Sequence, residues 1–197
     1  TFGHYKFSRF SLGKVIPAAK WKAMTICTMP ILGFTMVFYS TMNLFHLDFL
    51  PKQMMEMSYL GFLPYNIIGS FIPVYIFFGA IQEELIRCGK KRWVQLLTLS
   101  IMMLPACMMS VTPSGDINVD LTVLGFITLC YCSWIYGKTR STIILIVLYF
   151  VSNLVPFHFE SKALGILLLI AGTALTIGGF AVLSRKLPEM LVKDENE

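Results

Sequence analysis

The chain is dominated by long apolar runs that short polar connectors separate. A helix rises about 1.5 Å per residue and the apolar core of a bilayer is about 30 Å thick, so a crossing needs about 20 residues. Six segments meet this need: residues 22–46, 59–82, 93–112, 119–136, 141–157 and 163–184. Backbone groups in lipid need partners within the protein, so these segments should be helices. The pattern predicts an all-α, polytopic transmembrane bundle with six spans.

The composition favours the same class of protein. The chain of 197 residues is 56% hydrophobic and 14% charged, and its mean hydropathy is +0.69. Soluble domains carry about 25% charged residues. The five cysteines lie in or beside apolar runs, which is typical of small apolar packing residues and not of disulfides or metal ligands.

The basic residues predict the orientation of the spans. Of the 16 lysines and arginines, all but Lys52 and Lys162 fall on one predicted side of the membrane. By the positive-inside rule, both ends of the chain are expected in the cytoplasm. The domain organisation follows as a cytoplasmic N-terminal segment (1–21), a transmembrane domain (22–184) and a cytoplasmic tail (185–197). Because the net charge of +5 lies in these loops, it indicates orientation and not nucleic-acid binding.

Two motifs carry candidate chemistry. The stretch GAIQEELIRCGKKRW (79–93) places Gln82, Glu83, Glu84 and Arg87 where an apolar helix ends. The stretch KTRSTIILIVLYFVSN (138–153) holds Thr139, Ser141, Tyr149 and Asn153 around the start of another. Together they resemble the motifs of the CAAX protease and bacteriocin-processing family, over about residues 60–157.

The resemblance implies a metal-independent, glutamic-type intramembrane endopeptidase in a plasma membrane, with a prokaryotic origin. In that family a glutamate and a histidine activate water, and a histidine and an asparagine stabilise the oxyanion. This sequence departs from the pattern. If Glu83 and Glu84 are the family's pair, Cys88 replaces its arginine. If Arg87 is that arginine, the pair becomes Gln82 and Glu83, and an amide replaces the first carboxylate.

The histidines of the family's pattern are also missing. Residues 100–113 contain none where one is expected, and Tyr149 replaces the later one. His4, His46 and His158 are the histidines of the chain, and none is predicted to lie near Glu83. Because water activation needs a base within hydrogen-bond reach, the sequence predicts a degenerate member of the family.

Structural interpretations compete with catalytic ones at these positions. Glu83 and Arg87 are i,i+4 neighbours and favour an ion pair, and a polar pocket for a ligand or partner is the other alternative. Tyr149 and Asn153 lie one turn apart, which favours hydrogen bonding between helices over a ligand site. Gly165, Gly172 and Gly179 recur every seven residues in the last span and predict close helix packing.

Three functions remain open from the sequence. The favoured one is a protein that acts by binding, as a scaffold, regulator or stabiliser of another integral membrane protein. The second is an active endopeptidase that processes prenylated or leader-type peptides, and the third is a bacteriocin-immunity protein or small transporter. Membrane lipid is an expected contact in each, and no cofactor, metal or nucleic acid is expected.

Overall fold

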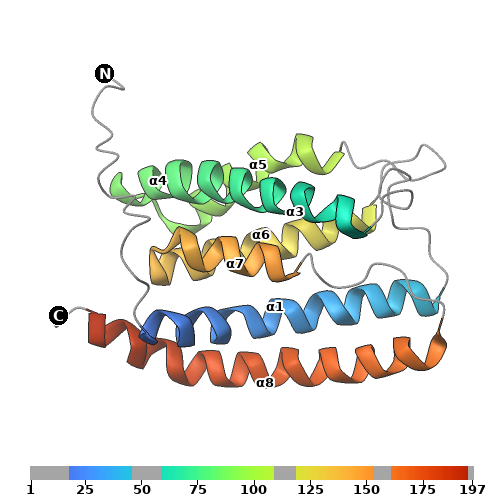
Figure 1. Cartoon of the computed structure of the whole chain (residues 1–197). Coiled ribbons are helices and arrows are strands. Elements are labelled where there is room, and N and C mark those ends of the chain that lie inside the picture. The colour runs from blue at the N-terminus through green and yellow to red at the C-terminus, as the bar shows by residue number, and fades with distance from the viewer. Residues whose placement is uncertain (1–17, 46–58, 109–118, 153–160, 195–197) are drawn as a thin grey trace.

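The computed structural model describes residues 18–45, 59–108, 119–152 and 161–194, and every regular element in these ranges is a helix. The elements are α1 (Ala18–Leu44), α3 (Tyr59–Pro73), the π-helix η2 (Val74–Gln82), α4 (Glu83–Arg87), α5 (Arg92–Met108), α6 (Val119–Thr139), α7 (Thr142–Ser152) and α8 (Lys162–Asp194). The helices lie side by side, with α6 and α7 between the α1–α8 pair and α3–α5 (Figure 1). The predicted all-α fold is confirmed.

Three helices in the described ranges are long and apolar enough to cross a membrane, namely Trp21–Leu44, Asn66–Arg87 and Lys162–Lys186. Thr142–Ser152 is apolar but shorter. Each of the six predicted segments contains a helix, whereas six crossings stay a prediction. Helical backbone continues without a break beyond the predicted span end at residue 82, through α4 to Arg87.

A π-helix interrupts the α-helical pattern just before the first motif. Pro73 ends α3 and directly precedes η2. Proline has no N–H and its ring crowds the carbonyl four residues earlier, so the regular i→i+4 ladder is disturbed there. At the far end of η2, the backbone N–H of Glu83 points to the carbonyl of Phe78, five residues earlier. The wider turns of η2 decide which way the following side chains face.

The buried core lies where η2, α5, α6 and α7 meet α1. Its members are apolar residues from each of these helices together with Leu183 of α8. Phe78, Leu99, Ile135 and Leu148 are among the side chains with no exposed surface. The buried hydroxyls of Thr28 and Thr35 are satisfied within α1, where each donates to the carbonyl four residues earlier at 2.6 Å.

The most extensive contact between helices joins α1 and α8, and glycines make it close. A Cβ on Gly172 would lie 2.8 Å from the carbonyl oxygen of Gly33, and one on Gly179 would lie 2.9 Å from the backbone nitrogen of Pro30. Both distances are shorter than real Cβ contacts, so only glycine fits at either position. Gly165 is buried as well. The opposite face of α8 exposes large apolar side chains such as Ile170 and Ile177.

Candidate functional site

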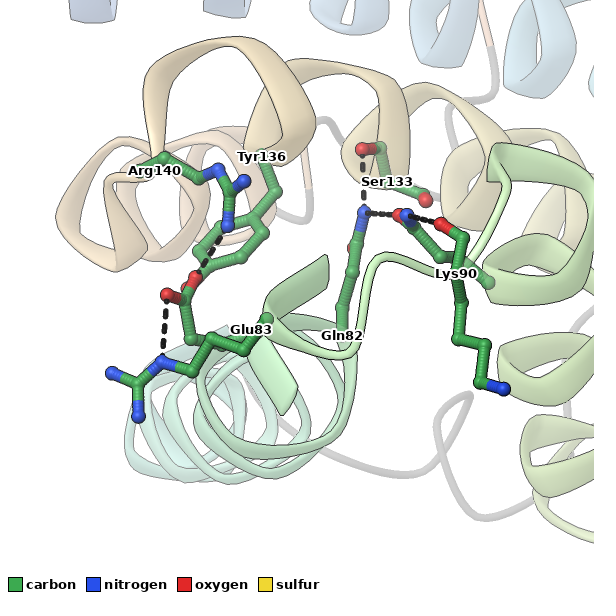
Figure 2. Close-up of polar contacts among 8 residues, drawn as sticks. Gln82, Glu83, Lys90, Ser133, Tyr136 and Arg140 are labelled. Atoms are coloured by element: carbon green, nitrogen blue, oxygen red, sulfur yellow. Dashed lines mark hydrogen bonds and ion pairs between the residues drawn. The ribbon is translucent and has the colours of Figure 1, made fainter. Parts of the chain in front are cut away.

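The end of η2 separates the two residues of the first motif. Gln82 is the last residue of η2 and Glu83 is the first of α4. Gln82 is 1% exposed and points into the bundle, whereas the side chain of Glu83 keeps 21% of its surface exposed. Figure 2 shows the two side chains directed toward different partners. The adjacent residues therefore belong to two separate polar networks.

The carboxylate of Glu83 links α4 to α6 and to the turn that follows α6. Its Oε1 lies 3.4 Å from Nε of Arg87, as the i,i+4 spacing predicted. Its Oε2 accepts a hydrogen bond of 3.0 Å from the Tyr136 hydroxyl and one of 2.9 Å from Nη1 of Arg140. Charged hydrogen bonds of this kind are stronger than neutral ones. We call Glu83, Arg87, Tyr136 and Arg140 the Glu83 cluster (Figure 2).

Arg140 reaches Glu83 from an unusual backbone conformation. Its φ is +50°, in the left-handed region where non-glycine residues are uncommon. The backbone N–H of Arg140 donates to the carbonyl of Tyr136 at 2.8 Å, which closes the end of α6. This conformation costs about 1–3 kcal/mol. The stabilisation that the ion pair between Arg140 and Glu83 provides therefore has to offset this backbone strain.

Thr139 and Ser141, which match the second motif, make local bonds beside Arg140. The Thr139 hydroxyl donates to the carbonyl of Ile135 at 2.9 Å. The Ser141 hydroxyl accepts the backbone N–H of Ile144 at 3.5 Å, in the manner of an N-cap for α7. Both side chains thus support the ends of the helices that the turn connects.

Gln82 belongs to a second network, which is buried at Gln82, Gln95 and Ser133. Its Nε2 donates to Oε1 of Gln95 at 3.3 Å and to the carbonyl of Ser133 at 2.9 Å. Nε2 of Gln95 in turn donates to the carbonyl of Lys90 at 2.8 Å. The Oε1 atom of Gln82 is buried without a hydrogen-bond partner. An unsatisfied buried oxygen is destabilising by about 1–3 kcal/mol, so this network is incomplete.

Glu84 and Tyr149 are the remaining candidate residues that the structure describes. Glu84 is exposed on α4 and Tyr149 is partly buried on α7. The ring of Tyr149 lies 6.4 Å from that of Phe78, which itself lies 6.3 Å from the ring of Tyr136. Tyr149 therefore belongs to an aromatic group that includes Tyr136 of the Glu83 cluster.

Several predicted positions lie outside the described residues, namely Asn153, His4, His46 and His158. Within the described ranges, no group of three or more His, Cys, Asp or Glu side chains is placed to hold a metal ion. The interpretation of the cysteines as apolar packing residues holds for buried Cys27 and Cys132. It is wrong for Cys88, which is exposed in the turn after α4.

Most partners in these networks are far apart in the sequence. Tyr136 and Arg140 lie 53 and 57 residues from Glu83, and Ser133 lies 51 residues from Gln82. From the sequence alone, Arg140 is one of the cations that predict the orientation of the spans. One feature of the sequence does point to Arg140, namely its position in the four-residue connector between two apolar helices. This turn places the end of α6 and the start of α7 at the same level as the end of α4.

The fold and these networks define an all-helical protein with helices of membrane-spanning length and a polar cluster at one end of its bundle. Comparisons of the chain with models of known protein families, with characterised proteins and with solved structures found no match. The similarity of its two motifs to those of the CAAX protease and bacteriocin-processing family stays a prediction.

Proposed function

We propose that this chain is a multi-pass membrane protein that acts by binding, as a scaffold, regulator or stabiliser of another membrane protein. It would be a degenerate relative of the family that its motifs resemble, with six spans and both ends in the cytoplasm of a prokaryotic cell. The three long apolar helices and the exposed apolar face of α8 support insertion into a bilayer. Lipid would cover the side chains that no other helix covers.

The geometry of Glu83 is the observation that carries the non-catalytic part of the proposal. A general base needs its oxygen directed at the water whose proton it takes. Both oxygens of Glu83 instead accept bonds from Arg87, Tyr136 and Arg140 within the protein. The adjacent Gln82 is a buried amide, and an amide cannot take up a proton at neutral pH. This arrangement favours a structural role for Glu83, in which its carboxylate links α4 to α6 and to the turn after α6.

Purification from native membranes in a mild detergent tests the binding function. We expect the tagged protein to elute with a second membrane protein in fixed stoichiometry. A tagged membrane protein of similar size, purified from the same membranes, controls for unspecific association. Elution only as a lone chain, at every detergent concentration that preserves the fold, would contradict the proposal.

A peptidase assay tests the enzymatic alternative directly. The purified protein is incubated with prenylated and leader-type peptides, and the products are identified by mass spectrometry. We expect no cleavage. Cleavage that both Glu83→Gln and Glu84→Gln leave unchanged indicates a contaminant, whereas cleavage that either variant abolishes would establish the endopeptidase and overturn our proposal.

A further inference from the structure

Two short turns place a dense group of cations at one end of the bundle. The first turn (87–92) connects α4 to α5, and the second (138–141) connects α6 to α7. Figure 1 shows that both lie at the same end of the bundle. Their exposed cations are Arg87, Lys90, Lys91, Arg92, Lys138 and Arg140, and neither turn contains an acidic residue.

Both turns have a defined backbone. Gly89 has a φ of +67°, its N–H donates to the carbonyl of Ile86, and the N–H of Lys90 donates to the carbonyl of Leu85. This pair of bonds is a Schellman motif, which closes α4. Arg140 closes α6 through the equivalent left-handed position. The cations are therefore carried on ordered backbone, and holding an anion between them requires little further ordering.

The two turns also contact each other. The guanidinium of Arg92 lies against the last turn of α6, since a Cβ on Gly137 would be 3.4 Å from its Nη2. Glu83 links the turns a second time through Arg87 and Arg140. α4 and the two turns together contain six cations and two carboxylates, those of Glu83 and Glu84. This joint surface consequently carries a net positive charge.

The position of this surface along the bundle indicates what covers it. The apolar helix Asn66–Arg87 ends at the first turn, and Trp93, directly after Arg92, is 64% exposed. Trp21 at the start of α1 is 58% exposed and lies at the same end of the bundle. Exposed tryptophans at the ends of membrane helices mark the level of the lipid headgroups. The cations thus lie at the depth of the headgroup phosphates.

We propose that Lys90, Lys91, Arg92 and Lys138 form a binding site for the phosphate-bearing headgroup of an anionic phospholipid. Lysine ammonium groups attract a phosphate as point charges, and an arginine fork donates two parallel hydrogen bonds to it. Clusters of cations directly beyond a membrane helix are a known form of lipid recognition. The site rests on the proposed insertion into a bilayer, and it is independent of the proposed partner protein.

The test uses the full chain with Trp93 as its reporter. Trp21→Phe and Trp134→Phe leave Trp93 as the single tryptophan, and the protein is reconstituted into phosphatidylcholine vesicles. Brominated phosphatidylglycerol or brominated phosphatidylcholine is then added as a fraction of the lipid, and the quenching of Trp93 gives the relative association constant of the two lipids. We expect a preference of several-fold for the anionic lipid at low salt, which falls as salt is added.

Two triple variants separate a defined site from a general surface potential. Lys90→Gln with Lys91→Gln and Arg92→Gln should abolish the several-fold preference, because each cation near an anionic surface contributes up to about a fivefold effect. Lys22→Gln with Arg185→Gln and Lys186→Gln removes the same charge from the same end of the bundle, on the α1–α8 pair. This second variant should change the preference less than twofold. The double variant Lys90→Gln, Lys91→Gln keeps the contact between Arg92 and Gly137 and should give an intermediate loss.

Three results would overturn the site. The first is equal quenching of Trp93 by both brominated lipids in the protein with unmodified turns. The second is an equal loss of lipid preference in the two triple variants, and the third is no loss of preference in the variant of Lys90, Lys91 and Arg92. Absence of quenching by either brominated lipid would show that the chain is not inserted, and would overturn the membrane proposal together with the site. Loss of the lipid preference alone leaves the partner function standing, so the two failures are distinguishable.

Discussion

Glu83 and Glu84 are adjacent residues of the same type, but their surroundings differ. Glu84 is exposed on α4, whereas Glu83 is held from one side by Arg87 and from the other by Tyr136 and Arg140. The i,i+4 pair with Arg87 was predicted and is confirmed, but it is the longer of the two ion pairs, at 3.4 Å against 2.9 Å. The tertiary pair with Arg140 is the one that joins separate helices.

We expect the two ion pairs to differ in their contribution to stability. Arg140→Gln should lower the free energy of unfolding by about 1–2 kcal/mol, because it removes a charged hydrogen bond to a half-buried carboxylate. Arg87→Gln should cost about 0.3–0.5 kcal/mol, as an exposed i,i+4 pair does. Thermal unfolding in detergent measures both, through thiol-reactive dye labelling of buried Cys27 and Cys132 in a background in which Cys88, Cys107 and Cys130 are changed to Ala. Equal losses of stability in the two variants would contradict the role of the Glu83–Arg140 pair in linking separate helices.

Gln82 allows a second prediction at the scale of one residue. Gln82→Glu would restore paired carboxylates at 82 and 83, but the new oxygens would face the acceptor Oε1 of Gln95 and the carbonyl of Ser133. A buried charge without donors is strongly unfavourable, so we expect a loss of about 3 kcal/mol or more and no gain of peptidase activity. Gln82→Met, of similar volume, is the control and should be milder. A stable Gln82→Glu protein with the wild-type melting temperature would contradict the prediction.

At the scale of elements, the helix that carries the first motif is divided into α3, η2 and α4, and α8 is held by α1. Pro73 and the wider turns of η2 change the direction of the side chains that follow, which buries Gln82 beside Ser133. Gly79 in η2 permits a close approach to α7, where its Cβ would lie 3.2 Å from Cγ2 of Thr142. The α1–α8 contact depends on glycine in the same way.

Alanine substitutions in α8 should separate close contact from helix propensity. Gly172→Ala places a methyl group within 3.0 Å of the α1 backbone and should destabilise the protein by about 1–3 kcal/mol. Gly178→Ala is the matched control, because a Cβ there has no neighbour within 4 Å. It should be neutral or stabilise the helix by up to about 1 kcal/mol. Thermal unfolding measures both, and equal effects would contradict the role of Gly172 in packing.

At the scale of the whole molecule, the helices align the basic connectors at one end of the bundle. The start of α1, α4, the α6–α7 turn and the end of α8 lie together there, whereas α8 begins at the opposite end with Lys162 (Figure 1). The basic connectors thus share one end of the bundle, whereas the orientation of that end toward the cytoplasm stays a prediction. This arrangement also brings Arg87, Lys90 and Arg140 into one surface.

Cysteine accessibility in intact cells tests this orientation. In a Cys88→Ala background, Lys90→Cys and Lys138→Cys should be protected from a membrane-impermeant maleimide added outside the cells. Lys162→Cys should react with it. The physical reason is that all three positions lie at helix ends, and α8 begins with Lys162 at the opposite end of the bundle from the two turns that carry the other two (Figure 1). Labelling of position 90 from outside, or equal labelling of all three, would contradict the proposed topology.

The sequence was sufficient to predict an all-helical chain and the approximate bounds of its helices. The basis was the length of its apolar runs, which exceeds that of most helices in soluble proteins, together with its few charged residues. The i,i+4 pair of Glu83 and Arg87 was also predictable, because the geometry of a single helix decides which side chains meet. Such properties depend on residues close in the sequence.

Only the tertiary structure decided which distant groups meet. The bond from Arg140 to Glu83, the burial of Gln82 against Ser133 and the seating of Gly172 on Gly33 all join separate helices. Their partners depend on how η2 turns the chain after Pro73 and on how closely the helices pack, and neither follows from a regular helical repeat. Local spacing determines what a helix presents, whereas packing determines what each presented group contacts.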